Sequence, residues 1–289
     1  SGFNAMPGLN VAILGATGLV GQEFIKILAE RNFPIDSVRL LASSRSVGRK
    51  INVAGVDVTV EEAGPDSFRD IDVALFSAGG GPSRHFAPIA ASSGAVVIDN
   101  SSAFRMEDDV PLVVPEVNPE DAAAHHGIIA NPNCSTIQMV VALWPLHRVN
   151  PIRRVTVATY QAVSGTGVAA VEALGHETRA VLDGAAVTPH VYPHQIAFNT
   201  LPQIDVFLDN GYTKEEWKMI QETRKIMHAP DMAVSATCVR VPVYRGHSEA
   251  VQIEMDHLMP PDKARETLGQ APGVHLIYDP TVAPSPMPP

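Results

Sequence analysis

The sequence predicts an α/β fold in two parts, and three observations support this. Short, almost wholly apolar segments alternate with helical patterns up to about residue 133. A glycine-rich turn follows the first of these segments, Asn10–Leu14. Beyond residue 134, polar and apolar residues alternate as in strands with one exposed face. We therefore expect a parallel sheet covered by helices on both faces, followed by an α+β part with antiparallel strands.

The composition of the 289-residue chain is that of a globular protein, with 45% hydrophobic and 18% charged residues. A net charge of −10 argues against nucleic acid as a partner, and the apolar runs are too short to span a bilayer. The only cysteines, Cys134 and Cys238, favour a reducing cytoplasmic location. Residues 1–5 resemble an expression tag, and the proline-rich stretch 280–289 predicts irregular structure.

The turn Gly15–Gly21 indicates a strand–turn–helix unit that binds a dinucleotide. Gly15, Gly18 and Gly21 precede a helical pattern that runs to about Arg31. Glycines here let the backbone approach a pyrophosphate, which rests on the N-terminus of the following helix. The spacing is G-x-x-G-x-x-G rather than G-x-G-x-x-G, so a generic strand–helix turn is the alternative. The context predicts a Rossmann-type domain over residues 9–133.

The end of the second predicted strand favours NADP over NAD as the cofactor. The segment Val38–Ala42 leads into Ser43–Ser46, which contains Arg45 and three hydroxyl groups. An NAD site usually has an acidic residue near this point for the ribose, whereas a guanidinium suits the 2′-phosphate of NADP. A solvated arginine is the alternative.

Three further apolar segments, 72–76, 95–99 and 128–130, continue the parallel sheet, with a helix expected over 84–93. Ligands bind beyond the carboxyl ends of such strands. These ends are followed by residues 77–81, 100–105 and 131–134. Cys134 is therefore predicted to follow the sheet at its ligand-binding edge.

Cys134 is the strongest candidate for a catalytic residue. Pro132 disfavours helix at Asn131, so the next helix is expected to begin at about Asn133 or Cys134. The positive end of a helix dipole stabilises a thiolate, which is the nucleophilic form. The unpaired N–H groups there could also hold an oxyanion. The alternative is a small buried residue, since free cysteine is often buried.

The second part contains two alternating segments, 155–161 and 250–255, that predict strands. Thr213 and Glu216 have the spacing of a capping box at a helix start. Glu215 and Lys218 are i,i+3 neighbours there, for which a solvated ion pair is the simplest interpretation. His247 follows a glycine in a turn-like stretch, where an acid or base can be presented.

Two histidine groups raise the question of a metal site. They are His125–His126 and the pair His190 and His194, which Pro193 interrupts. A helical zinc motif needs both ligands on one face, so neither group fits, and no metal is predicted.

Six stretches together resemble the aspartate-semialdehyde dehydrogenase family, in family order from about Leu9 to about Asp279. They are Gly15–Gly21, Asp99–Arg105, Asn131–Thr136, Thr159–Gly165, Glu215–Lys218 and Arg240–Ser248. The resemblance implies NADP-dependent reductive dephosphorylation of L-4-aspartyl phosphate to L-aspartate 4-semialdehyde through a cysteine thioester. This reversible reaction serves the biosynthesis of lysine, diaminopimelate, threonine, methionine and isoleucine.

The resemblance also implies a role for each matching residue. Cys134 matches the nucleophile, His247 the acid/base and Gln161 the residue that orients the substrate. The substrate residues are Arg240 for the α-carboxylate, Glu215 for the α-ammonium, and Arg105 with Lys218 for phosphate. The cofactor residues are Gly15, Thr17, Gly18, Leu19, Val20, Arg45, Ser46, Ser164 and Gly165. The family further implies a catalytic and dimerisation domain over 134–289, and a cytoplasmic homodimer or homotetramer.

One departure from the family pattern concerns the end of the chain. The family continues with a strand and a glycine-rich helical segment that help to close the cofactor site. The chain ends at Pro289 before this segment, so we expect a poor enzyme.

Two other functions compete with this interpretation. An N-acetyl-glutamyl-phosphate reductase performs the same chemistry on a substrate without a charged amine, which the Glu215 match and Ser135 after the cysteine disfavour. A dehydrogenase-like binding module without turnover is the second alternative, and an unreactive Cys134 would favour it.

Overall fold

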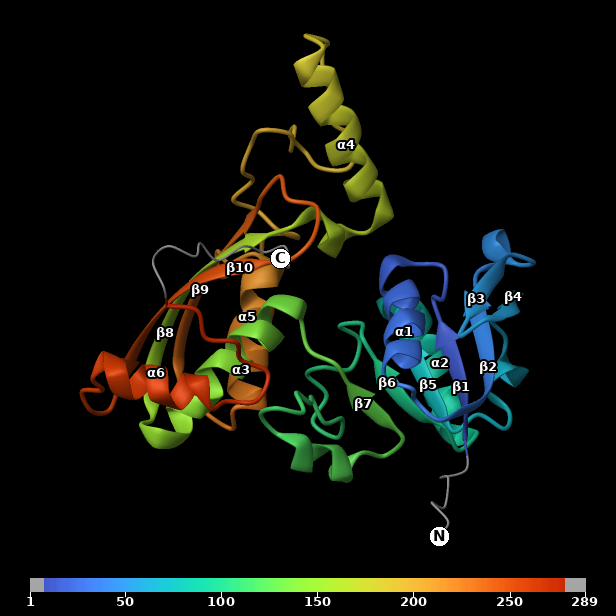
Figure 1. The fold of residues 1–289 in the computed structure, drawn as a ribbon, viewed down its shortest axis with the longest axis horizontal. Coiled ribbons are helices and arrows are strands. Elements are labelled where there is room, and N and C mark those ends of the chain that lie inside the picture. Colours follow the sequence, from blue (N-terminus) through green and yellow to red (C-terminus); the bar gives the residue numbers. More distant parts are fainter. Residues whose placement is uncertain (1–7, 279–289) are drawn as a thin grey trace. The chain divides into compact units, whose positions relative to one another are not determined.

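The computed structural model describes residues 8–278, which fold into two compact units (Figure 1). One unit holds the chain up to residue 113 together with 120–132, and the other holds 114–119 together with the chain from residue 133. The expression-tag prediction for residues 1–5 and the irregular tail predicted at 280–289 lie outside the described residues.

The first unit is built on one seven-stranded sheet in the order β3-β4-β2-β1-β5-β6-β7. Its strands are β1 (Leu9–Leu14), β2 (Ile35–Ala42), β3 (Lys50–Val53), β4 (Val56–Glu62), β5 (Val73–Phe76), β6 (Val96–Asp99) and β7 (Ile128–Ala130). All neighbouring pairs are parallel except β3 and β4, which form an antiparallel hairpin at one edge. The parallel sheet is confirmed, and the hairpin adds two strands to it.

Successive residues of β1 face opposite sides of this sheet, and both sides are buried. Val11 and Ile13 pack with Ile25 of α1 (Leu19–Glu30), whereas Ala12 and Leu14 share a core with Ala87 of α2 (Gly80–Ser92). Because each face is covered by a helix, the strand is almost continuously apolar. The helix predicted over 84–93 begins one turn earlier, at Gly80.

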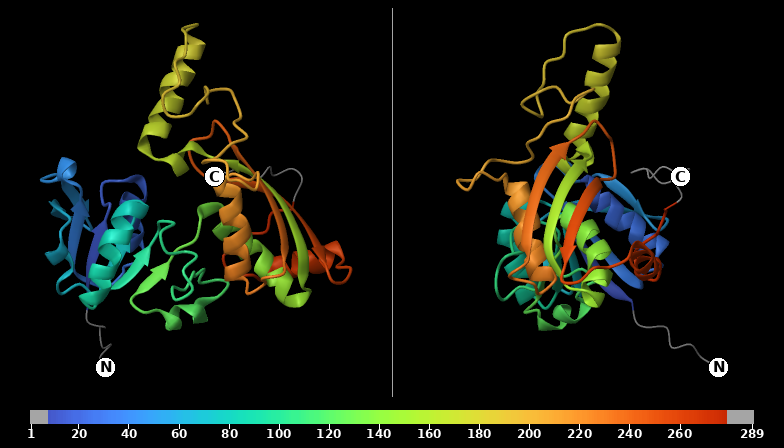
Figure 2. Two further views of the ribbon diagram at one scale, coloured as in Figure 1. Left: turned by 180° about the vertical axis from the view of Figure 1, so that it is seen from behind. Right: turned by 90° about the vertical axis from the view of Figure 1, so that its left-hand side faces the viewer.

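The second unit contains a three-stranded sheet in the order β10-β8-β9. The strands are β8 (Ile152–Gln161), β9 (Ala233–Arg240) and β10 (Ser248–Met255). The helices are α3 (Cys134–Val149), α4 (Val168–Leu182), α5 (Lys214–Ile226) and α6 (Pro261–Gly269). Figure 2 shows α3 and α5 on one face of this sheet. Short 3₁₀ turns connect the elements at Ser44–Ser46, Pro65–Phe68, Pro119–Ala124 and Val163–Thr166.

The pairing in this sheet is mixed, since a parallel pair joins the antiparallel pair that the sequence predicted. β10 pairs antiparallel with β8, but β8 and β9 are parallel, with Gln161 opposite Arg240. A parallel pair needs a long crossover, and the chain between β8 and β9 includes α4 and α5. This crossover brings the ends of β8 and β9 together at one edge.

Alternation along β8 decides what each face meets. Val155, Val157 and Thr159 are buried, while Thr156 and Tyr160 on the opposite face are exposed.

α5 begins at the predicted capping box: Oγ1 of Thr213 accepts from the N–H of Glu216, and the Glu216 carboxylate accepts from the N–H of Thr213. Within residues 8–278, no helix is both long enough and apolar enough to cross a bilayer.

Candidate active site

The candidate nucleophile occupies the first position of a capped helix. α3 begins at Cys134, and Asn133 is its N-cap. Oδ1 of Asn133 accepts hydrogen bonds from the N–H groups of Ser135 at 3.0 Å and Thr136 at 3.3 Å. The cap satisfies two donors that a helix start leaves unpaired. The helix start predicted at about Asn133 or Cys134 is confirmed.

The hydrogen bonds around Asn133 leave fewer backbone N–H groups at the start of α3 to hold an oxyanion than the sequence predicted. The N–H of Asn133 donates to Oε2 of Glu222 at 2.7 Å, and those of Ser135 and Thr136 donate to the cap. Three backbone donors around Cys134 are thus already engaged inside the protein. Their effect on the thiol is electrostatic, through the dipole of α3.

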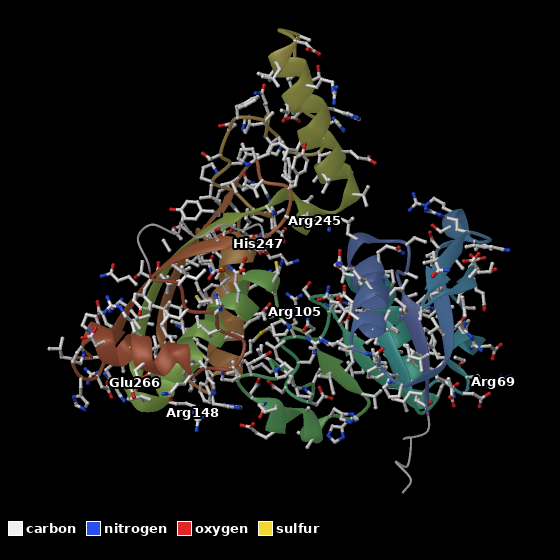
Figure 3. The ribbon with its side chains drawn as sticks, in the orientation of Figure 1. Arg69, Arg105, Arg148, Arg245, His247 and Glu266 are labelled. Atoms are coloured by element: carbon white, nitrogen blue, oxygen red, sulfur yellow. The ribbon has the colours of Figure 1, made fainter. Side chains whose placement is uncertain are left out.

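Cys134 and His247 form a hydrogen-bonded pair, although 113 residues separate them in the sequence. Sγ of Cys134, which is exposed, lies 3.3 Å from Nε2 of His247. Figure 3 labels His247 in the loop that leads into β10. A thiol or thiolate at this distance from an imidazole is the arrangement that nucleophilic cysteine chemistry requires.

The second nitrogen of His247 fixes its tautomer. Nδ1 accepts a hydrogen bond from the backbone N–H of Ala162 at 2.9 Å. Because a backbone amide can only donate, the single proton of the neutral imidazole lies on Nε2, facing the cysteine sulfur. Burial, and next the Arg240 guanidinium, lower the pKa of His247, and the carboxylate of Glu215 opposes them only in part. The imidazole is therefore neutral at pH 7 and donates toward Sγ.

A second buried group centres on Glu215, whose carboxylate accepts three hydrogen bonds. Oε1 accepts from Nδ2 of Asn133 at 2.8 Å and from Nε2 of Gln161 at 3.3 Å, and Oε2 pairs with Nζ of Lys218 at 3.3 Å. Lys218 also pairs with Asp205 at 3.2 Å. Only 7% of the Glu215 side chain is exposed, so the predicted solvated pair with Lys218 is in fact buried on the carboxylate side.

The two neighbouring carboxylates determine the pKa of Lys218. Burial alone lowers the pKa of Lys218, but the carboxylates of Glu215 and Asp205 outweigh it, and the net shift is upward. Lys218 is therefore a permanent cation beside Glu215. The Glu215 and Asp205 carboxylates thus hold the Lys218 ammonium between them.

Arg240 lies at the end of β9, opposite Gln161, and is 5% exposed. Its Nη1 donates to the carbonyl of Ala162 at 2.7 Å, and its Nε is buried without a hydrogen-bond partner. A buried guanidinium with an unused donor suits a carboxylate ligand. Gly165 lies against this group, since a Cβ there would be 3.3 Å from Nη1 of Arg240 and 3.6 Å from the His247 ring.

Arg105 belongs to the first unit, in the segment after β6 (Figure 3). Its Nε donates to the carbonyl of Asn131 at 2.9 Å, and its Nη2 donates to the carbonyl of Asn100 at 3.0 Å. Asp99 braces the same segment by accepting from the N–H and hydroxyl of Ser101. The guanidinium is thus held in a fixed position at the carboxyl ends of β6 and β7.

The first unit has a cavity of about 490 Å³ at the carboxyl ends of β1, β2, β4 and β5. The glycine turn and Arg45 line it, and the full lining is Leu14, Gly15, Thr17, Gly18, Ala42, Ser43, Ser44, Arg45, Glu62, Ala63, Ser77, Ala78, Pro82 and Phe86. No side chain caps α1, whose N-cap is Gly18, and its first turn has no acidic residue. An uncapped helix start fits an anionic pyrophosphate.

At two positions of the turn, any residue with a Cβ atom would clash with the backbone, so glycine is required. Gly15 has φ of 88°, and a Cβ on it would lie 2.4 Å from the carbonyl oxygen of Ser77. A Cβ on Gly21 would lie 2.3 Å from the carbonyl oxygen of Gly15, so α1 could not pack so closely against the turn. The irregular glycine spacing thus serves the same close approach that the usual dinucleotide motif provides.

The structure brings most of the predicted residues together, in two groups. Four predicted cofactor residues line the cavity, and Ser46 contacts one of them through a 3.4 Å approach between its Oγ and Oγ1 of Thr17. Leu19 and Val20 begin α1 directly after the turn. Ser164 and Gly165 lie in the second unit, and Gly165 is next to Arg240 and His247.

Sequence reasoning missed several residues of both groups. Asn133 and Glu222 surround the nucleophile, and only the capping preference of asparagine could have signalled the first. Glu62 and Phe86 line the cavity, but no sequence motif marks them. Ser77, which also lines it, could have been predicted because it follows the end of a strand. For the histidine groups considered above, the described part of the chain contains no cluster of three or more His, Cys, Asp or Glu side chains that could hold a metal ion.

A dinucleotide cavity in one unit and a cysteine–histidine pair beside an arginine and a carboxylate in the other define a class of protein: dehydrogenases that act through a cysteine thioester. Family models agree with this class. The semialdehyde dehydrogenase NAD binding domain matches residues 10–125, and the semialdehyde dehydrogenase dimerisation domain matches residues 143–288. The chain belongs to the aspartate-semialdehyde dehydrogenase family.

Individual relatives support this membership over nearly the whole chain. The chain is 56% identical to the aspartate-semialdehyde dehydrogenase of Aquifex aeolicus over 285 residues, covering 97% of this chain and 84% of the relative. It is 53% identical to that of Bacillus subtilis, with the same coverage. The crystal structure of aspartate semialdehyde dehydrogenase II from Vibrio cholerae superimposes with a TM-score of 0.91 at 50% identity, covering 92% of this chain and 80% of that one.

Proposed function

We propose that this protein catalyses the NADP-dependent reductive dephosphorylation of L-4-aspartyl phosphate to L-aspartate 4-semialdehyde, in biosynthesis of lysine, diaminopimelate, threonine, methionine and isoleucine. The observation that carries the proposal is the cysteine–histidine pair, 3.3 Å apart, in one unit with a buried arginine and a buried carboxylate. A related structure from Vibrio cholerae, 49% identical, was solved in complex with ASA, and one from Candida albicans, 28% identical, with NADP.

Cys134 acts as the nucleophile. Its thiolate attacks the acyl carbon of the aspartyl phosphate, forming the C–S bond of a thioester, and the C–O bond to phosphate breaks. The Nε2–H of His247 first stabilises the thiolate and afterwards lies near the oxygen on which negative charge develops, as an acid/base should. Bound NADPH would supply the hydride that reduces the thioester, and the C–S bond would then break to release the aldehyde and return Cys134 as the thiolate.

The substrate is recognised by charge. Arg240 pairs with the α-carboxylate and Glu215 with the α-ammonium, so the two ends of the zwitterion meet opposite charges. Gln161 bridges them, because its side chain contacts Glu215 while its backbone lies opposite Arg240. This pairing distinguishes an amino acid from an N-acylated analogue, whose uncharged nitrogen would leave a buried carboxylate unpaired.

Arg105 and Lys218 bind the phosphate group. Arg105 is supported by two backbone carbonyls, and Lys218 holds its charge through Glu215 and Asp205. Phosphate binding at Lys218 would compete with Asp205, the more exposed of its two partners.

NADP binds in the cavity of the first unit, with the pyrophosphate on Gly15–Gly18 and the 2′-phosphate on Arg45. Thr17, Leu19, Val20 and Ser46 complete this contact, and Ser164 and Gly165 are further cofactor residues. We assign cofactor binding to residues 9–133, and catalysis and dimerisation to 134–289.

The protein assembles as a homodimer, or as a homotetramer built from two dimers, in the cytoplasm. The family model over residues 143–288 describes a dimerisation domain. One face of the β8–β10 sheet exposes Thr156, Tyr160 and Thr237, and a second copy could cover it. Neither Cys134 nor Cys238 forms a disulfide, as suits a reducing compartment.

The test is phosphate-dependent reduction of NADP with aspartate 4-semialdehyde as substrate. The proposal predicts that reduction requires phosphate or arsenate and that N-acetylglutamate semialdehyde is a poor substrate. Arg240→Leu and Glu215→Gln should impair use of the aldehyde, and Arg105→Leu use of phosphate. Equal turnover of both aldehydes, or no phosphate requirement, contradicts the proposal.

A further inference from the structure

Asn133 connects the candidate nucleophile, Cys134, to Glu215, the carboxylate proposed to bind the substrate amine. The side-chain amide of Asn133 donates to Glu215 through Nδ2, and its Oδ1 caps the helix that begins at Cys134. The backbone N–H of the same residue donates to Glu222. Asn133 is 7% exposed, so all these groups find their partners inside the protein. Any movement of Asn133 therefore displaces the Cys134 thiol and the Glu215 carboxylate together.

Glu222 is the deeper of the two carboxylates that hold Asn133. It lies seven residues after Glu215 on α5, a spacing of about two turns that places both on one face of the helix. It is 1% exposed, and Oε2 lies 2.7 Å from the nitrogen of Asn133. A buried carboxylate that accepts a backbone N–H gives a strong, directional contact, because both groups have been withdrawn from water.

The contact to Glu222 fixes a part of Asn133 that its other bonds leave free. The cap and the bond to Glu215 both use the side chain, which can rotate about its own bonds. The bond to Glu222 holds the peptide between Pro132 and Asn133 and so orients the whole residue. α3 has only this cap at its start, and no acidic residue lies in its first turn.

We infer that Glu222 is a positioning residue of this enzyme. It acts through Asn133 to hold Cys134 in reach of His247 and to hold Glu215 toward the substrate amine. This role requires no contact between Glu222 and the reacting atoms. The inference rests on the proposed function for its effect on substrate use, but its effect on the thiol is independent of the substrate.

The test measures the alkylation rate of Cys134 by iodoacetamide as a function of pH, without substrate or cofactor, together with kcat and KM for the aldehyde. We expect Glu222→Ala to slow alkylation at pH 7 by about fivefold or more and to lower kcat/KM by about 10²-fold. Glu222→Gln keeps an acceptor oxygen and should fall between this variant and the wild type. It also serves if Glu222→Ala does not fold.

The sign of the effect on alkylation separates positioning from simple charge. Removing a negative charge near a thiol favours the thiolate and by itself speeds alkylation. Slower alkylation in both variants therefore supports lost geometry, and an unchanged or faster rate overturns the inference. If the wild type does not turn over the aldehyde, the proposed function fails while the alkylation comparison still decides the role of Glu222.

Glu177→Ala is the matched control. Glu177 is also buried, at 4% exposed, and accepts the N–H groups of Ile196 and Ala197 at 2.8 and 3.1 Å, but it lies on α4. Its loss should lower the midpoint of thermal unfolding and leave the alkylation rate of Cys134 unchanged. A general loosening of the second unit would instead slow alkylation equally in Glu177→Ala and Glu222→Ala, which would contradict a specific role.

Discussion

The nucleotide cavity and the catalytic cluster are built in opposite ways. The cavity is lined by strand ends and turns between Leu14 and Phe86. The catalytic cluster spans residues 133 to 247, and charged or polar side chains hold one another in place. The cavity is thus formed by neighbouring stretches of one unit, whereas the cluster is a network of mostly buried side chains.

The difference in burial determines how each region tolerates change. Arg45 is exposed, so replacing it leaves no buried group of the protein without a partner. Glu215 and Arg240 are 6% and 5% exposed, and removing either leaves buried partners unsatisfied. Substitutions in the cluster should therefore act more steeply than those in the cavity.

The largest effect is expected at the centre of the cluster. Cys134→Ala removes the nucleophile and should lower kcat by about 10³-fold or more while the fold is kept. Cys238→Ala is the control, because Cys238 is buried and burial raises the pKa of its thiol to about 12. Steady-state kinetics with circular dichroism tests this, and near-normal turnover by Cys134→Ala would remove it from the mechanism.

The cavity is tested through the cofactor phosphate. Arg45→Ala should weaken NADP binding by about 1–3 kcal/mol and change NAD binding little, because only NADP carries the 2′-phosphate. Arg49→Ala is a matched control, an exposed arginine in the same segment that does not line the cavity. Titration of both cofactors by fluorescence or calorimetry measures the effect. An equal loss for both cofactors would show that Arg45 does not contact the 2′-phosphate.

A single methyl group should disturb the cluster more than its size suggests. Gly165→Ala places a Cβ 3.3 Å from Arg240 Nη1 and 3.6 Å from the His247 ring, which are themselves fixed by hydrogen bonds. We expect kcat/KM to fall by about tenfold, since small displacements of catalytic groups are costly. In Gly269→Ala the nearest atom would be a Leu276 methyl at 3.7 Å, so activity should persist. Equal activity of the two variants would show that the cluster is adaptable.

The last effect concerns the dependence of stability on pH rather than activity. Burial raises the pKa of Glu249 from 4.5 to about 7, against a hydrogen bond from Gln138. The native state then holds a proton that the unfolded chain releases, so stability is full below pH 4.5 and falls as the pH rises to about 7. Glu249→Gln cannot ionise and should raise the unfolding free energy at pH 8 by about 1–3 kcal/mol, with little change at pH 4.5.

Urea unfolding at the two pH values measures this effect. Glu254→Gln, on the opposite face of β10 and exposed beside Arg154, should leave the pH dependence as it is in the wild type. If Glu249→Gln and the wild type have the same free energy of unfolding at both pH values, ionisation of the Glu249 carboxyl group does not destabilise the fold.

The sequence by itself determined the features that depend on a few neighbouring residues. The turn Gly15–Gly21 predicted the dinucleotide unit, Pro132 predicted the start of α3, and Thr213 with Glu216 predicted the start of α5. Each is a local signal, because backbone geometry and hydrogen bonds within one turn decide it. The parallel sheet of the first unit was predictable for the same reason, from short apolar strands alternating with helices.

Only the tertiary structure decided which distant residues meet. His247 reaches Cys134 across 113 residues, and Asn133 joins Glu215 and Glu222 across 82 and 89. The parallel pairing of β8 with β9 brings Gln161 opposite Arg240, and the N–H of Ala162 sets the tautomer of His247. These contacts depend on how whole helices and strands pack, and each is fixed because a buried polar group must find its partner inside the fold, wherever in the sequence that partner lies.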